Sequence, residues 1–217
     1  MKNWWYYHKW YVILGTIGFG IVVYLIGNAL GFFTKSPDLQ IAYVGKTRLP
    51  QDTVTALQQA FTSLAGDFNQ DGEVIIQINQ YIDDGTLTVA EAFYAEVPLI
   101  GDIANCDSYF FLTDDPQDLQ RKYQIYACPD GGTPEDTDYS IEGKVIRFSD
   151  CKVLTEMDLG SYSETNLWQT ADGSNAELLS GLFFGRRCFY TDDVTDNLQE
   201  CSDLWDLLYN SQENKKD

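Results

Sequence analysis

The sequence predicts an α/β protein with one N-terminal transmembrane helix, followed by a small βαβ-type domain. We expect that domain to have a mainly parallel sheet with helices on both faces. Two observations lead to this fold class. The run 10–33 is almost wholly apolar, with Thr16 and Asn28 as its polar residues. After it, short apolar runs typical of buried strands alternate with stretches of helical spacing, a pattern typical of βαβ units.

The apolar run 10–33 is long enough to cross a bilayer, because a helix rises about 1.5 Å per residue and the hydrocarbon core is roughly 30 Å thick. Residues 1–9 form an aromatic and basic flank that contains Lys2 and Lys9 and no acid. Such a flank stays in the cytoplasm, so we expect a cell-membrane protein with a single span and an extracellular C-terminal domain. The run exceeds a signal-peptide core and no A-x-A site follows it. An uncleaved signal anchor is therefore favoured over a cleaved signal peptide.

The charge of the chain is strongly one-sided. All 33 acidic residues follow the apolar run, and the formal net charge is -19. Such a surface repels phosphates, which excludes nucleic acid as a partner. It fits a solvated extracytoplasmic surface, or one that meets cations or a basic partner.

Gly27 and Gly31 form a G-x-x-x-G pair inside the predicted span. This spacing lets two membrane helices approach closely, although glycine is common in such helices in any case. Pairing with another helix, in a membrane or cell-surface protein, is therefore one interpretation of the motif.

A short linker, 34–38, precedes the predicted α/β domain at 39–209, and a polar tail covers 210–217. The expected strands are short apolar or alternating runs, at 39–44, 74–78, 109–113, 144–148 and within 178–190. The expected helices have apolar residues at helical spacing, at 50–64, 88–104, 119–123 and 197–209.

Three finer expectations concern the elements of this domain. Pro98 and Gly101 are expected to interrupt the helix 88–104, which Thr88 and Glu91 open as a capping box. The stretch 127–175 is predicted to be a loop-rich insertion, because it begins with Pro, Gly, Asp and Thr. Its polar end, 160–175, is expected to be a loop that Trp168 anchors to the core.

The most distinctive motif is a row of oxygen-bearing side chains after the first helix of the domain. Asp67, Asn69 and Asp71 stand at positions one, three and five of a loop, and Gly72 follows at position six. Glu73 can offer its main-chain carbonyl at position seven. These positions match the first half of an EF-hand-type calcium loop.

The second half of the motif does not match, because positions nine and twelve are Ile75 and Ile78. The usual bidentate carboxylate is therefore missing. The eight-residue pattern resembles the calcium loops of dockerin-like modules and of the periplasmic galactose-binding protein. In the latter, a carboxylate from a distant segment completes the shell, which implies a similar carboxylate that the sequence does not nominate. We predict a Ca²⁺ site at Asp67, Asn69, Asp71 and Glu73; the alternative is a turn that caps the preceding helix.

The position of the single histidine excludes most familiar catalytic sites from the domain. His8 is the one histidine in the chain, and it precedes the apolar run. The domain therefore cannot hold a Ser-His-Asp triad, a Cys-His pair or a histidine-ligated zinc. Adjacent acids, which in principle allow carboxylate catalysis, are better explained as solvated turns and helix starts; they are Asp83-Asp84, Asp114-Asp115 and Asp192-Asp193.

Two further residue types leave alternatives open. Arg186-Arg187 is either a binding site for a carboxylate or phosphate, or a neutralising group for nearby acids. The cysteines either pair locally, as 128 with 151 and 188 with 201, or are small buried apolar residues. The fifth cysteine is Cys106.

Three segments together resemble single-pass, membrane-anchored extracytoplasmic proteins of Gram-positive bacteria, a family without an assigned activity. They are Tyr7-His8-Lys9-Trp10, the loop from Asp67 to Gly72, and Asp203-Leu204-Trp205. The order of strands and helices is also similar to one lobe of a periplasmic-binding-protein fold. These resemblances imply a topology and not an activity.

The function expected from the sequence is a membrane-anchored extracytoplasmic binding or interaction module that is non-catalytic and stabilised by calcium. One alternative is a reduced solute-binding lobe that serves a transporter, although about 180 residues are few for two lobes. A carboxylate-dependent enzyme is the third hypothesis.

Overall fold

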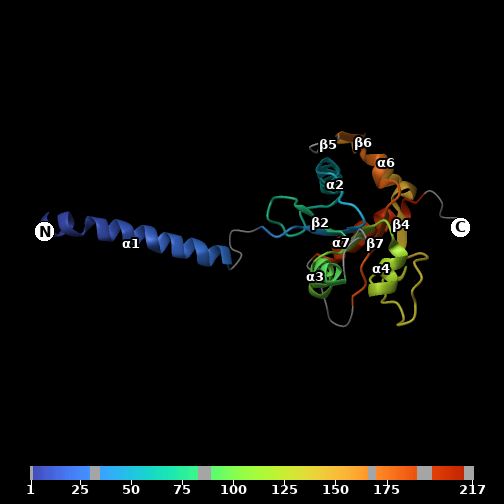
Figure 1. The fold of residues 1–217 in the computed structure, drawn as a ribbon, viewed down its shortest axis with the longest axis horizontal. Coiled ribbons are helices and arrows are strands. Elements are labelled where there is room, and N and C mark those ends of the chain that lie inside the picture. Colours follow the sequence, from blue (N-terminus) through green and yellow to red (C-terminus); the bar gives the residue numbers. More distant parts are fainter. Residues whose placement is uncertain (1, 30–34, 83–88, 166–169, 190–196, 213–217) are drawn as a thin grey trace. The chain divides into compact units, whose positions relative to one another are not determined.

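The computed structural model describes residues 2–29, 35–82, 89–165, 170–189 and 197–212. The chain divides into two compact units, 1–36 and 37–217, and each is described by itself (Figure 1).

The first unit consists of the helix α1, Lys2–Ala29. Its segment Asn3–Asn28 is long and apolar enough to cross a membrane. The helix begins before the apolar run, so the aromatic and basic flank is helical as well. Residues 30–33, with Gly31 of the predicted pairing motif, lie outside the described residues, so helix pairing stays a prediction.

The second unit contains a five-stranded sheet with the strand order β2-β1-β3-β7-β4. The strands are β1 (Leu39–Gly45), β2 (Ile76–Ile82), β3 (Phe110–Thr113), β4 (Val145–Arg147) and β7 (Phe183–Arg186). β1 is parallel to β2 and β3, whereas β7 is antiparallel to its neighbours β3 and β4. All strands except β7 therefore run in one direction, which confirms a mainly parallel sheet.

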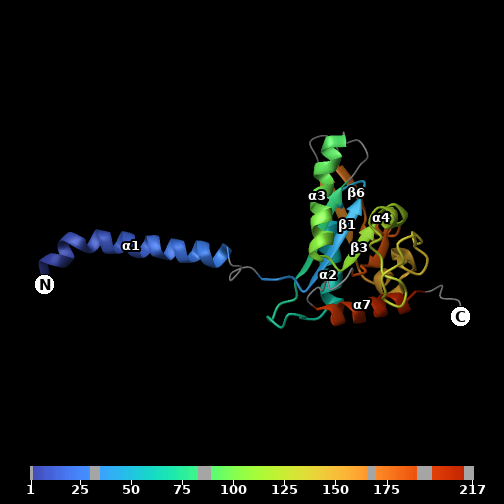
Figure 2. The same cartoon turned by 90° about the horizontal axis from the view of Figure 1, so that it is seen from below.

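Six helices and a hairpin accompany this sheet in the described part of the second unit. Figure 2 shows the larger helices beside the strands. The helices are α2 (Gln51–Leu64), α3 (Val89–Asn105), α4 (Pro116–Tyr123), α5 (Lys152–Thr155), α6 (Asn175–Leu179) and α7 (Leu198–Asn210). A 3₁₀ turn, η1, covers Phe148–Asp150. The hairpin consists of β5 (Ser161–Thr165) and β6 (Thr170–Ser174).

Alternate side chains of β1 enter two hydrophobic clusters. Leu39 and Ile41 belong to the larger cluster, together with side chains of α2 and α7. Ala42 belongs to the smaller one, together with side chains of α3, α4 and β3. Because successive side chains of a strand point to opposite faces, the two clusters occupy opposite faces of the sheet.

Two expectations about the elements were wrong. α3 continues through Pro98 and Gly101 to Asn105, because packing of Leu99 in the smaller cluster and the hydrogen bonds that Asp102 accepts from neighbouring segments offset the donor that proline removes. The polar stretch 160–175 contains the hairpin β5–β6 and the start of α6 rather than a loop. The ring of Tyr162 lies directly over Gly173 of the partner strand, so this hairpin is packed as well as paired. Trp168 and Thr88 lie outside the described residues.

Candidate functional site

The predicted calcium loop lies between α2 and β2 and is held by its own main-chain amides. Asp67 accepts hydrogen bonds from the amides of Asp71, at 3.1 Å, and Gly72, at 2.8 Å. Asn69 also accepts from the Asp71 amide, and Asp71 accepts from the Glu73 amide, both at 3.0 Å. Gly72 has a φ of 89°, in the left-handed region that favours glycine. The structure therefore brings the predicted residues together in one tight turn.

The chemistry of this loop allows a hard cation without supplying a complete shell. Asp67, Asn69 and Asp71 carry oxygens with further lone pairs after they accept the amides. Among the residues that the structure describes, no group of three or more His, Cys, Asp or Glu side chains is close enough to hold a metal ion. A calcium shell would therefore depend on the Asn69 amide, main-chain carbonyls and water as well as the carboxylates.

Asp38 connects this loop to the sheet, and the sequence did not nominate it. Its side chain is buried at the start of β1. One carboxylate oxygen accepts from the amides of Phe68, at 2.7 Å, and Asn69, at 3.0 Å, and the other from Ile75, at 2.8 Å. Asp38 therefore holds the start of the loop and a residue just after its end from a distant segment. Both of its carboxylate oxygens accept hydrogen bonds from main-chain amides. The sequence offered one sign of this role, which is an acid directly before a strand expected to be buried. In the structure, β1 and β2 begin at the same end of the sheet.

The arginine pair does not present a binding surface. Arg186 and Arg187 are both buried and are adjacent in sequence, on β7 and directly after it. Arg186 donates to the carbonyls of Pro129, at 3.1 Å, and Cys128, at 3.4 Å. Its Nε is buried and has no hydrogen-bond partner among the described residues. Among the described residues, no carboxylate lies within 4.0 Å of either guanidinium.

Arg187 closes the end of α3 by donating to the carbonyls of Ile103, at 2.8 Å, and Ser108, at 3.3 Å. Beside it, the buried carboxylate of Asp102 accepts from the Tyr81 hydroxyl at 2.7 Å and from the Ser108 hydroxyl at 2.6 Å. Burial, and then this carboxylate, raise the pKa of the Tyr81 phenol. The network joins β2, α3 and the start of β3, so its charged groups maintain the fold.

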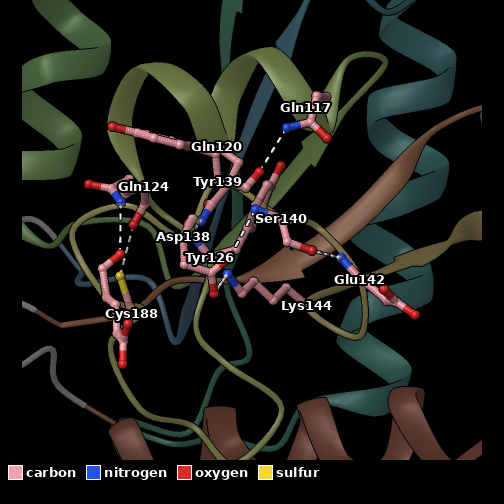
Figure 3. Close-up of polar contacts among 11 residues, drawn as sticks. Gln117, Gln120, Gln124, Tyr126, Asp138, Tyr139, Ser140, Glu142, Lys144 and Cys188 are labelled. Carbon is pink, nitrogen blue, oxygen red and sulfur yellow. Dashed lines mark hydrogen bonds and ion pairs between the residues drawn. The ribbon is translucent and has the colours of Figure 1, made fainter.

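A third polar group fixes the segment 127–143, the strap, against α4 (Figure 3). Three glutamines spaced along α4 and its end, Gln117, Gln120 and Gln124, donate to strap carbonyls. Their acceptors are Tyr139 at 2.7 Å, Asp138 at 3.2 Å and Glu135 at 3.1 Å.

Lys144 closes the strap at its far end. Its buried ammonium lies 2.7 Å from the carboxylate of Asp138, and this contact holds the pKa of that carboxyl below its usual value. Under the strap, the Tyr126 ring packs against Gly185, and its buried hydroxyl has no hydrogen-bond partner in the part of the chain that the structure describes. Burial raises the pKa of that phenol.

The acid pairs and cysteines have ordinary structural roles where the structure describes them. Asp115 caps α4 by accepting from the Asp118 amide at 3.0 Å, and Asp114 accepts from the Lys46 amide at 3.3 Å. The pairs 83–84 and 192–193 lie outside the described residues. None of the five cysteines, all of which lie in the described residues, forms a disulfide, and four of them are buried. The interpretation as small buried residues is therefore the one observed.

Comparison of the chain with protein-family models, with curated proteins and with solved structures finds no match.

Proposed function

We propose that this chain is a membrane-anchored extracytoplasmic module, with helices on both faces of its sheet, that works by binding a membrane or cell-surface protein and not by catalysis. The observation that carries the proposal is a candidate span at Asn3–Asn28 next to a separate folded unit that holds every acidic residue of the chain. Residues 30–38 separate the span from β1. At about 3.5 Å per residue they reach at most about 30 Å.

The buried charged side chains of the folded unit bond to groups of the fold itself, which supports a binding function over carboxylate catalysis. Asp38, Asp102, Arg187 and Lys144 are buried, and each satisfies main-chain groups or a nearby side chain of the fold. A catalytic carboxylate instead needs an oxygen directed at a substrate. The family resemblance and the N-in orientation support the same proposal as predictions from the sequence.

The orientation and the interaction are tested on intact cells. With a C-terminal epitope tag, the folded unit should be removed by added protease while a cytoplasmic marker survives; full protection of the tag would refute the orientation. Photo-crosslinking residues at positions 77, in β2, and 207, in α7, sample two exposed sites. A defined protein adduct from at least one site is expected, and the absence of adducts from both would contradict an interaction module.

Calcium is proposed as a stabilising ion of the loop 67–73, because its oxygens are held in one turn. The full chain in uncharged detergent should show a higher melting temperature in millimolar calcium, since extracellular calcium sites bind at about 0.1–1 mM. Asp67→Asn and Asp71→Asn should abolish the shift, whereas Asp158→Asn, in an exposed turn elsewhere, should keep it. A wild-type melting temperature that does not respond to calcium would remove the ion from the proposal.

A further inference from the structure

Among the residues that the structure describes, β2 is an edge strand, and its own sequence lacks the usual protective residues. It stands at one end of the sheet order and pairs all seven of its residues with β1 in an unbroken parallel register. Natural edge strands carry lysine, proline or a bulge, or are very short, because their free amides and carbonyls can pair with another chain. The sequence IQINQYI contains no charged residue and no proline.

The main chain of β2 alternates between its partner and the free edge. The Ile75 carbonyl, just before the strand, accepts from the Leu39 amide of β1. In a regular parallel ladder, residues 77, 79 and 81 then also face β1, and residues 76, 78, 80 and 82 face outward. Gln58 donates to the outward carbonyl of Ile76 at 2.9 Å. In the described part of the chain, no hydrogen bond reaches the outward main-chain groups of Ile78 or Gln80.

Side chains near the edge show what an added strand would contact. On one face, Ile78 and Ile82 are half-buried against the larger hydrophobic cluster. On the other face, Gln77 is exposed and donates to Asn79, which in turn donates to Gln40 of β1. An added strand would therefore place apolar side chains beside the isoleucines and polar ones beside the amide row.

The charge of the chain distinguishes between two candidate partners for this edge, a second copy of the chain and a basic segment of another protein. The loop that leads into β2 carries Asp67, Asp71 and Glu73, and the whole chain has a net charge of -19. A second copy of the chain would bring the same charge to the edge and be repelled. A segment with lysine or arginine would instead be attracted to the acidic loop at the start of the edge.

We propose that the free edge of β2 accepts an extended segment of a partner protein as a sixth strand, with apolar and basic residues alternating along that segment. Main-chain hydrogen bonds would give the affinity, as in other cases of β-strand addition. This inference rests on the proposed interaction function and names the class of segment that the module binds.

The test uses the full chain in uncharged detergent and a fluorescent peptide of four Val-Lys repeats, with binding followed by fluorescence anisotropy. Two further peptides carry N-methyl groups on the valines alone or on the lysines alone. Only alternate peptide amides can face β2, so one methylated peptide should lose at least about tenfold in affinity while the other stays close to the parent. The two have equal charge, so a purely electrostatic association would affect both alike.

Failure of the parent peptide to bind would overturn the proposal, and so would equal affinities of the two methylated peptides. A Val-Glu peptide should bind much more weakly than the Val-Lys peptide, and equal binding of the two would overturn the assignment of a basic partner. With the photo-crosslinking residues, the Val-Lys peptide should form an adduct at position 77 and not at position 207. If native adducts form in cells only at position 207, the interaction function stands and the edge proposal is wrong.

Discussion

Single buried residues hold distant parts of this domain together. Asp38 is an example, because three hydrogen bonds connect it to one loop. Its carboxylate accepts hydrogen bonds from three main-chain amides, those of Phe68 and Asn69 within the turn 67–73 and that of Ile75 after it. Charge-assisted bonds of this kind are stronger than neutral ones, and each lost partner leaves a buried amide unsatisfied. Asp38 therefore controls where the loop sits relative to β1.

Replacing this carboxylate should strongly destabilise the domain. Asp38→Ala leaves three part-buried amides without an acceptor, so we expect a loss of about 2–4 kcal/mol in the free energy of unfolding, measured in urea. Asp38→Asn retains one acceptor oxygen and should lose less. Asp158→Ala removes a carboxylate from an exposed turn and is the control, with an expected loss below about 1 kcal/mol. Similar values for Asp38→Ala and Asp158→Ala would contradict the role assigned to Asp38.

Titration of the Cys201 thiol on α7 should make the free energy of unfolding depend on pH in the alkaline range. Burial raises its pKa from 9.0 to about 12. Above pH 9 the unfolded chain releases this proton while the folded chain keeps it. The thiol's contribution to stability is therefore complete below pH 9 and is lost as the pH rises through about 12.

Within that window, the wild-type free energy of unfolding should fall more steeply with pH than that of Cys201→Ala, by up to about 1.4 kcal/mol per pH unit. Urea unfolding at about pH 9, 10 and 11 measures the two slopes. Leu207→Ala, at an exposed position of α7 that carries no titratable group, is the control and should keep the wild-type slope. Identical slopes for the wild type and Cys201→Ala would show that this thiol does not titrate as proposed.

At the scale of elements, α4 organises the strap through its glutamine side chains. Gln120 is completely buried; its amide donates to the Asp138 carbonyl and its oxygen accepts from the Tyr126 amide at 3.0 Å. Gln117 is exposed and makes one bond, to the Tyr139 carbonyl. One helix therefore fixes a segment that has little regular structure of its own.

Gln120→Leu should release the strap while leaving the sheet intact. The change orphans one amide and one carbonyl inside the domain, so we expect a loss of about 2–3 kcal/mol and faster amide hydrogen exchange in 127–143. Gln117→Leu, the matched control, should cost less than about 1 kcal/mol, because solvent can replace its bond. Equal effects of the two changes on strap exchange would argue against the buried glutamine as the main fixing point.

For the whole molecule, the dominant feature is an excess of negative charge on the folded unit. All 33 acids lie in that unit, and the salt bridges among the described residues include surface pairs such as Arg121–Asp118 and Lys152–Glu156. Such pairs contribute little, whereas like-charge repulsion acts over the whole surface at low ionic strength. Screening should therefore stabilise the folded chain.

Raising sodium chloride from about 0.02 to 0.3 M should increase the melting temperature of the full chain in uncharged detergent by a few degrees. Choline chloride should act equally, because screening does not depend on the identity of the cation. A response to sodium alone would indicate a specific ion site, and a fall in melting temperature with both salts would contradict net repulsion.

The positions of most strands and helices could be predicted from the sequence because they depend on local patterns. The strand 39–44 is observed at Leu39–Gly45, and the helix 50–64 at Gln51–Leu64. The direction of β7 could not be predicted in this way, because it depends on which strands lie beside it. The hairpin β5–β6 was missed because its strands are polar, so hydrophobic alternation did not reveal them.

For the candidate site, the turn 67–73 was predictable because the side chains that hold it together are close in sequence. Asp38, which lies about 30 residues before the loop it holds, was not, and neither was the engagement of both arginines with main-chain carbonyls. By itself, the sequence determined the apolar span, the acidic folded unit and its element pattern, since composition and periodicity need no distant partner. Only the tertiary structure decided the partners of the buried charges and the free edge at β2, because both depend on contacts between segments far apart in the chain.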